Sequence, residues 1–377
     1  MQFNIGVYKI FVFEQIEFVA TAWQSLVNKN DALLTKNLKA IEESEIKNLK
    51  PYYLLVSKNN KNIGIIYLQL LNFNLSFIEV GVLNKWYFII IKKIMQGFQT
   101  KLLFCGNLFR INFKSFEGID AGETAMIIKT IAEKKHLGWK PCGIMLKDLS
   151  EKLPVQIIKK YKYKPMHEDV TMLLNIKNEW QNFDNYLSDL SRKYRKRAEK
   201  ILEAAKPIDV KSLTLEEITI NAEKIEFLYY QVAKRQTIRL GVLGSKYFIA
   251  MKKNLGKEFD FQGYFLGEEM IAFSSHIYYK NAMEIHYIGI NYTFNEKHQL
   301  YFNILFNGLH TAIIKKKNTL ELGRTAKEAK ASLGALPFEN MNYYCINNPF
   351  FEKIYSTITK RFSNQMGENW ANRNPLK

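Results

Sequence analysis

Three cationic side chains follow the end of an apolar segment in the last fifth of the chain. Arg324, Lys327 and Lys330 lie in "ELGRTAKEAKASLG" at 321–334, where a strand-like run passes a glycine and enters a short basic helix. Cations at a strand end can bind phosphate or carboxylate and can stabilise negative charge that develops during a reaction. We interpret Arg324 and Lys330 as catalytic groups of this kind and Lys327 as a substrate-binding neighbour. The alternative is a solvated surface helix with Thr325 as its N-cap.

Two further polar groups lie on the strands that lead to this stretch. Glu321 ends the run "NTLEL" and could serve as a base or pair with Arg324. Tyr287, in "MEIHYIGI" at 283–290, could donate a hydrogen bond to a reacting oxygen. Because side chains alternate along a strand, we expect His286, a further candidate base, to point to the opposite face.

Tyr301 opens the helical stretch after that strand. Groups in the first turn of such a helix can face the same site, so we interpret Tyr301 as a substrate-binding residue. A packing role in the core is the alternative for Tyr301 and for Tyr287.

A strongly basic segment lies upstream at 185–206, "NYLSDLSRKYRKRAEKILEAAK". Apolar residues at spacings of three and four predict one amphipathic helix over this whole range. Cations crowd its polar faces between 192 and 200 and repel one another. We interpret Arg192, Arg195 and Lys196 as part of a cradle for phosphate or a polyanion; a solvated basic face is the alternative.

The elements that would position these residues occur in the same order twice. Strand–turn–strand patterns at 51–70 and 257–290 each lie between helical stretches, and the later helices, 121–138 and 299–317, each precede another strand. The repeat predicts an α/β (α+β) fold with two duplicated units, each a mixed, largely antiparallel sheet flanked by helices. We place the boundary near residue 168, which gives units 1–168 and 169–377. The tail, 340–377, could pack on the first unit.

Composition narrows the class of protein. The 377 residues are 47% hydrophobic and carry 54 basic and 36 acidic side chains, a formal net charge of +18 that favours phosphate-bearing partners. The three cysteines form no CxxC pair and the histidines no HxH or HExxH pattern, so we expect no metal site. No signal-peptide pattern begins the chain, and the apolar run "WYFIIIKKIM" at 86–95 is too short to span a bilayer. We therefore expect a cytoplasmic protein.

Two of these segments together resemble a known family. "LSRKYRKRAEKI" and the stretch from "GEEMIAFSSHIYYKNAMEIHYIGIN" to "TLELGRTAKEAKASLGALP" resemble the acyltransferase domain of the Fem-like branch of the GNAT superfamily, over roughly 185–338. The resemblance rests on a Tyr-rich strand, a helix that ends in basic residues, and a strand that ends at Gly323 with Lys330 and Gly334 downstream. It implies two tandem GNAT-like domains, the first one degenerate. It also implies an N-acyltransferase that forms amide bonds from an activated ester or thioester.

One departure from the superfamily pattern bears on the donor. CoA-dependent GNAT enzymes carry a glycine-rich loop whose backbone N–H groups hold the pyrophosphate at a helix N-terminus. The corresponding stretch here, 289–303, lacks those glycines, and Gly118 and Gly122 in the first half are wrongly spaced. We therefore favour an acyl group carried on tRNA or acyl carrier protein, or an acyl-CoA held in an unusual way, and expect no tightly bound cofactor.

The acceptor is an amine whose identity the residues leave open. An amine in cell-envelope or lipid metabolism is permitted by the aromatic and cationic composition, with peripheral contact to an anionic membrane at its inner face. The rival interpretation is a non-catalytic RNA-binding protein. It rests on the net charge and on "RKYRKR" at 192–197, and it predicts binding that weakens steeply with salt.

Overall fold

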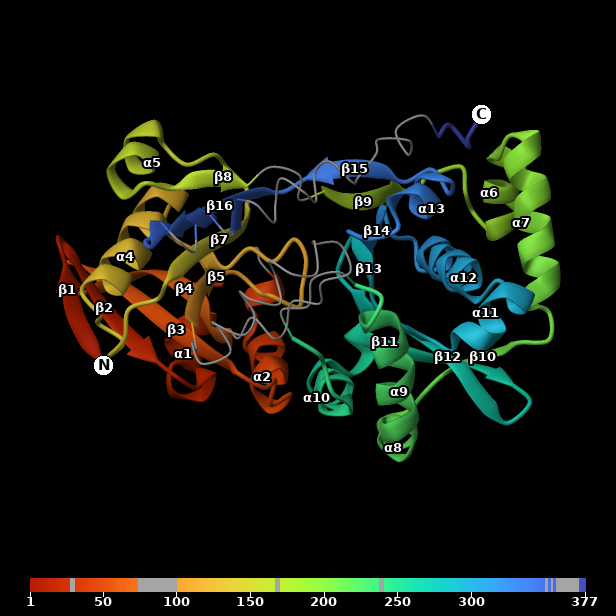
Figure 1. The fold of residues 1–377 in the computed structure, drawn as a ribbon, viewed down its shortest axis with the longest axis horizontal. Helices are drawn as coiled ribbons and strands as arrows, with labels where there is room; N and C mark the ends of the chain where they lie inside the picture. The colour runs from red at the N-terminus through yellow and green to blue at the C-terminus, as the bar shows by residue number, and fades with distance from the viewer. Residues whose placement is uncertain are drawn as a thin grey trace. The chain divides into compact units, whose positions relative to one another are not determined.

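The computed structural model describes residues 1–27, 31–73, 100–166, 170–236, 241–349, 352–353, 355–356 and 373–377 (Figure 1). The chain divides into two compact units. The first comprises Met1–Asp169, Thr237–Gly241 and Asn340–Gln365, and the second comprises Val170–Gln236, Val242–Glu339 and Met366–Lys377. The apolar run at 86–95 lies outside the described residues.

The first unit is built on a nine-stranded sheet. Its order is β1 (Gln2–Ile5), β2 (Tyr8–Phe13), β3 (Leu49–Lys58), β4 (Lys61–Phe73), β5 (Thr100–Cys105), β7 (Gly143–Leu149), β16 (Met341–Ile346) and β8 (Lys164–Met166), with β6 (Phe116–Glu117) paired to β4. Only β5 and β7 pair in parallel among these strands. The β3–β4 hairpin predicted at 51–70 turns at Asn59 and Asn60, whose positive φ angles of 50° and 58° suit a tight two-residue turn.

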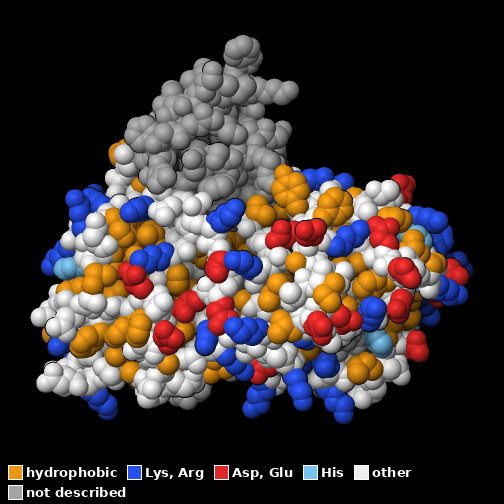
Figure 2. Space-filling model, turned by 90° about the horizontal axis from the view of Figure 1, so that it is seen from below, with side chains coloured by type: hydrophobic (Ala, Val, Ile, Leu, Met, Phe, Trp, Pro, Cys, Tyr) orange, Lys and Arg blue, Asp and Glu red, His pale blue; other side chains and the backbone are white. Residues whose placement is uncertain are grey.

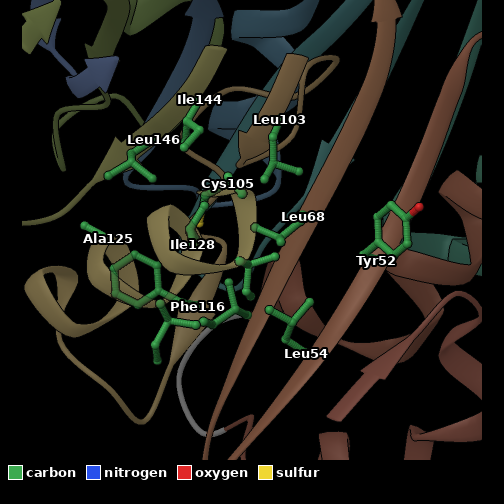
Figure 3. Close-up of a cluster of buried hydrophobic side chains, with 14 of the residues drawn as sticks. Tyr52, Leu54, Leu68, Leu103, Cys105, Phe116, Ala125, Ile128, Ile144 and Leu146 are labelled. Atoms are coloured by element: carbon green, nitrogen blue, oxygen red, sulfur yellow. The ribbon is translucent and has the colours of Figure 1, made fainter. Parts of the chain in front are cut away.

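Both faces of this sheet are covered. Helix α4 (Ala121–Glu133) begins at Asp120, whose side chain accepts a hydrogen bond from the backbone N–H of Glu123. Figure 3 shows its Ala125 and Ile128 packed against strand residues such as Leu68, Cys105 and Leu146. A second cluster lies with α1 (Ala20–Gln24) and α2 (Thr35–Glu43). A short α5 (Val155–Tyr161) completes the described helices here.

The second unit repeats the scheme with seven strands. Their order is β10 (Asp209–Ser212), β11 (Phe259–Leu266), β12 (Glu269–Tyr278), β13 (Ala282–Ile290), β14 (Thr319–Gly323), β9 (Val170–Asn175) and β15 (Leu336–Glu339). Only β13 and β14 pair in parallel within this sheet. In each unit a helix of more than three turns lies in the connection between the parallel strands: α4 between β5 and β7, and α12 (Leu300–Ile314) between β13 and β14. The predicted duplication of mixed, largely antiparallel sheets flanked by helices is confirmed.

Helices cover both faces of the second sheet as well. Met283 and Ile285 of β13 pack into a cluster with α12, α6 (Phe183–Asp189) and α7 (Arg192–Ala205). The opposite face meets α9 (Ala222–Ala233) and α10 (Ser245–Leu255), where Phe248 contacts Phe261 and Phe273. The short helices α8 (Leu215–Ile220), α11 (Tyr292–His298) and α13 (Lys327–Ala331) lie at the margins.

The helix predicted as one piece at 185–206 is two helices. Helix α6 ends at Asp189, Leu190 is extended with ψ of 139°, and α7 begins at Arg192. Leu190 forms a β-bridge with Leu376, and the N–H of Ser191 donates to the carbonyl of Pro375 at 2.8 Å. The break satisfies backbone groups through residues far away in the sequence, which helical periodicity does not reveal.

Two observations complete the fold. The stretch expected to be a donor loop, 289–303, contains α11, which Asn291 caps by accepting a hydrogen bond from the N–H of Thr293. In the ranges that the structure covers, every helix is too short or too polar to cross a bilayer.

Candidate active site at the β13–β14 fork

The parallel strands β13 and β14 pair only at their first residues. The paired positions are Ala282 with Thr319, Met283 with Leu320, and Glu284 with Glu321. Strand β13 then continues to Ile290 and β14 to Gly323 without further pairing between these two described strands. We call residues 285–290 and 322–323 the β13–β14 fork. Two diverging strands present main-chain polar groups between them, where a substrate can pair with them.

A β-bulge lies on the β13 arm of the fork. The pairing of β12 with β13 shifts between Ser274 and His276, so that both His286 and Tyr287 lie opposite Ser275. The hydroxyl of Ser275 accepts from the N–H of Tyr287 at 3.0 Å and donates to its carbonyl at 3.2 Å. Only 1% of the His286 side chain is exposed although the residue as a whole is half-buried, so its exposed surface is main chain.

The bulge overturns the expectation that His286 and Tyr287 point to opposite faces. Both rings contact Tyr247 of α10, with centroid separations of 5.7 Å and 6.0 Å. The alternation of side chains assumes an unbroken pleat, and the extra residue of a bulge places two consecutive side chains on one side.

His286 lies between a phenol and a carboxylate. Its Nδ1 is 2.5 Å from Oε1 of Glu284, and its Nε2 is 2.5 Å from the hydroxyl of Tyr247. The Tyr279 hydroxyl donates to the other oxygen of Glu284 at 3.0 Å. The side chains of His286 and Glu284 are 1% and 2% exposed, so these bonds form away from bulk water.

Tyr287 is enclosed by aromatic rings. Its ring meets those of His286, Tyr229 and Tyr247 edge to face, at centroid distances of 4.5, 5.6 and 6.0 Å. Burial raises the pKa of Tyr287 well above its usual value, and the positive charge of Arg324 acts in the opposite direction. The phenol therefore stays neutral and remains a hydrogen-bond donor, with the Arg324 guanidinium close enough to interact with it.

Lys330 turns inward rather than toward solvent. Only 3% of this residue is exposed, and burial lowers its pKa to about 7, while the carboxylate of Glu321 favours its charged form. The surface-helix interpretation is wrong at this residue, whereas Lys327 is half-buried. Thr325 is not the cap either: Ala326, in the left-handed region at φ 51°, precedes the five-residue helix α13 without a side-chain cap.

The four residues predicted as catalytic come together at one end of the second sheet. Electrostatic interactions join Tyr287 to Arg324 and Glu321 to Lys330. Glu321 also lies beside Glu284 as its partner in the parallel pair. Sequence patterns did not reveal Glu284 as part of this site, nor Tyr247. The only available signal was that Glu284 precedes His286 by two positions on one strand.

Of the residues predicted to bind substrate, Lys327 lies on α13 with Lys330, whereas the others lie on α7 and α12. Arg192 and Lys196 on α7 are exposed, and Arg195 is half-buried with its guanidinium donating to the carbonyl of Leu190 at 3.3 Å. Tyr301 packs among apolar residues in the first turn of α12, and burial raises its pKa. Helices α7 and α12 cover the sheet face opposite Tyr247.

The surface charge of the protein is dispersed on at least one side. Figure 2 shows Lys and Arg side chains mixed with Asp and Glu over the visible face. The net charge of +18 therefore does not gather into one continuous basic patch there.

The equivalent position in the first unit is occupied by the chain itself. Strands β5 and β7 pair from Leu102–Gly143 to Cys105–Leu146, and Gly106 follows β5 with φ of 145°. A Cβ placed on Gly106 would lie 2.6 Å from the Cβ of Lys147. The Lys147 ammonium is buried, donates to the carbonyl of Asn107 at 2.8 Å and lies 3.5 Å from the Asp148 carboxylate.

The described part of the chain contains no set of side chains suited to bind a metal ion. No group of three or more His, Cys, Asp or Glu side chains in those residues is arranged to hold a metal ion.

Residues 156–377 match the sequence model of the FemAB-like family, which is described as a peptidoglycan biosynthesis/recognition family. The chain belongs to the FemAB-like family. No curated protein is similar enough in sequence to match it.

Solved structures share the fold at low identity. FemX superimposes with a TM-score of 0.53 at 12% identity, over 93% of this chain and 100% of that one. A tandem GNAT protein from the clavulanic acid biosynthesis pathway gives 0.53 at 9% identity, over 91% and 99%. A protein of unknown function from Bacteroides thetaiotaomicron gives 0.50 at 8% identity, over 89% and 98%. The chain thus has a tandem GNAT fold.

Family and fold together indicate an acyltransferase that uses an acyl donor and an amine acceptor. Nothing in them supports the RNA-binding alternative.

Proposed function

We propose that the protein transfers an acyl or aminoacyl group from an activated carrier to an amine at the β13–β14 fork. The observation that carries this proposal is the divergence of β13 from β14 after Glu284, with the buried Lys330 at its closed side. A carbonyl group lying in the fork would meet exposed main chain at the bulge and a cationic side chain nearby. Acyl transfer requires such preorganised charge for the tetrahedral oxyanion.

The roles we assign follow from the charges. Tyr287, a neutral phenol, donates a hydrogen bond, while Arg324 and Lys330 stabilise developing negative charge. Lys330, with a pKa of about 7, is partly neutral at physiological pH, and an anionic group that approaches it favours its protonated form. We assign Glu321 to holding that charge rather than to removing a proton, because it is the carboxylate that acts on Lys330.

We assign the reaction to the second unit. Strands β13 and β14 diverge after Glu284 there, whereas in the first unit Lys147 packs closely against Gly106 at the end of β5. The first unit then serves as a degenerate copy.

The donor we favour is carried on tRNA or on acyl carrier protein. Segment 289–303 contains the seven-residue helix α11 and the first residues of α12, and it lacks the glycine-rich loop with which CoA-dependent relatives hold the pyrophosphate. The exposed cations of α7, among them Arg192 and Lys196, offer an alternative hold on a phosphate-rich or acidic carrier. Lys327, half-buried beside Lys330, would complete that hold near the site.

The acceptor we propose is an amine of cell-envelope or lipid metabolism. The description of the FemAB-like family supports this choice. We propose that the reaction takes place in the cytoplasm, with contact to the inner face of the membrane if the amine is lipid-linked.

A donor screen tests the proposal. Purified protein is incubated with lysinamide as amine and, in turn, with alanyl-tRNA, acetyl-loaded acyl carrier protein and acetyl-CoA, and the amide product is measured by mass spectrometry. We expect product from a carrier-borne donor and a loss of about 100-fold in kcat for Arg324→Ala. Undiminished turnover in that variant would remove Arg324 from the site, and no product with any donor would contradict the proposed function.

A further inference from the structure

Acyl transfer to an amine needs a proton acceptor, and none of the roles assigned above supplies one. An amine that attacks a carbonyl must lose a proton, and the leaving oxygen or sulfur must gain one. The roles assigned above use Arg324 and the protonated form of Lys330 to stabilise negative charge, and Glu321 to hold the Lys330 charge. The proton acceptor must therefore be found elsewhere near the fork.

The array of Tyr247, His286 and Glu284 has the geometry of a proton acceptor. An ionised Glu284 carboxylate can only accept, and across the 2.5 Å contact Nδ1 of His286 then carries the hydrogen. In the neutral imidazole, Nε2 is then the acceptor, and the Tyr247 hydroxyl, also at 2.5 Å, donates to it. A phenol whose proton is already directed at a base, and a base held in one tautomer by a carboxylate, is the arrangement that activates a hydroxyl oxygen in acyl-transfer enzymes.

The position of the array connects it to the fork. His286 is itself part of the bulge, and the Tyr247 ring contacts Tyr287, which interacts with Arg324 at the end of β14. Glu284 occupies the last paired position before the strands diverge. The ionisable groups around the array are Tyr287 on β13, Tyr229 on α9, Tyr279 after β12, and Glu321 with Arg324 at the end of β14.

We propose that Tyr247 accepts the proton of the attacking amine, with His286 and Glu284 as the positioning residues behind it. This inference rests on the proposed function. The amine nitrogen bonds to the donor carbonyl carbon, its proton passes to the Tyr247 oxygen, and the proton of Tyr247 moves to Nε2 of His286. When the carbon–oxygen or carbon–sulfur bond of the donor breaks, His286 returns the proton through Tyr247 to the leaving atom. No net proton is gained or lost.

Single and double variants distinguish a relay from ordinary packing. With the donor that the wild type uses and lysinamide as acceptor, Tyr247→Phe and Glu284→Gln should each lower kcat about 100-fold, with KM within about threefold. The double variant should be no slower than either single one, because groups that act as a unit are not additive. Tyr229→Phe, which alters another tyrosine whose ring contacts Tyr287, should change kcat less than about threefold.

A second measurement needs no activity. In the ¹⁵N-labelled protein, NMR should show His286 as the Nδ1–H tautomer, and Tyr247→Phe should perturb that resonance while Tyr229→Phe leaves it in place. An Nε2–H tautomer, additive kcat losses, or an equal loss in Tyr229→Phe would overturn the relay. Absence of product from the wild type would overturn only the proposed function, because the tautomer test stands without turnover.

Discussion

Replacement of Lys330 by methionine should remove a pH dependence from the stability of the second unit. Lys330 titrates near pH 7 in the folded protein, compared with 10.5 for an ordinary lysine. Between these two pH values the unfolded chain binds one proton more than the folded chain, so the free energy of unfolding rises with pH by about 1.4 kcal/mol per unit. Below pH 7 both states hold the proton, and this contribution to the slope vanishes.

The magnitude follows from that slope. From pH 7.5 to 9.5 the wild type should gain about 2.7 kcal/mol relative to Lys330→Met, which for a unit of this size is a shift of about 5 to 11 °C in Tm. Methionine has similar length and no charge, so packing is largely preserved. The lysine should therefore cost stability at neutral pH, as expected for a residue retained for chemistry.

Urea unfolding at five pH values, followed by circular dichroism, measures the difference between the two proteins. Groups that titrate elsewhere contribute to both curves and cancel. Lys327→Met, on the same short helix but half-buried, is the matched control and should run parallel to the wild type. Parallel curves for Lys330→Met and the wild type would refute the argument that Lys330 is held in a desolvated position.

Three further predictions test the surroundings of the site. Charge reversal of Arg192 and Lys196 to Glu should raise KM for a carrier-borne donor. It should also reduce the slope of log K against log salt concentration by about one for each lost phosphate contact. Lys206→Glu, at the end of α7, is the control and should change neither quantity. Gly289→Ala should lower the stability of the second unit by about 1 to 3 kcal/mol in thermal unfolding, because the added Cβ would lie 2.1 Å from the Phe273 ring. Lys147→Met in the first unit should leave kcat within about twofold, and a larger loss would show that the first unit takes part in the chemistry.

Local patterns were sufficient to predict the framework of the fold. The meanders at 51–70 and 257–290 follow from apolar runs rich in Tyr, Ile, Leu and Val and from the polar, Gly-containing turns between them. The repetition of that order along the chain predicted the duplicated architecture, because each unit can be recognised by its own sequence of helices and strands.

The details that shape the site depend on contacts between distant residues. The bulge at His286 and Tyr287 exists because Ser275 of the neighbouring strand ties the Tyr287 main chain. No residue pattern within β13 itself predicts the bulge. The break at Leu190 similarly requires Leu376, nearly the whole second unit away in sequence. A helical pattern through 185–206 could not contain that information.

The burial of Lys330 is a property that helical spacing in the sequence does not predict. Helical spacing places Lys330 on one face with Lys327, and a solvated surface helix is the alternative to the catalytic role that we assign to it. The helix is only five residues long and starts from Ala326 in a left-handed conformation, so the chain enters it at an angle that periodicity does not encode. Lys330 is buried there, and the carboxylate of Glu321 favours its charged form, which the sequence pattern alone does not show.

The most direct test of the account is amide formation by matched variants of the two units. Wild type, Lys330→Ala and Lys147→Ala would be compared with the active donor and lysinamide, with the amide product quantified by mass spectrometry. We expect a loss of about 100-fold in kcat for Lys330→Ala and turnover within about twofold of wild type for Lys147→Ala. Full activity of Lys330→Ala together with loss of activity in Lys147→Ala would place the chemistry in the first unit and contradict the central claim.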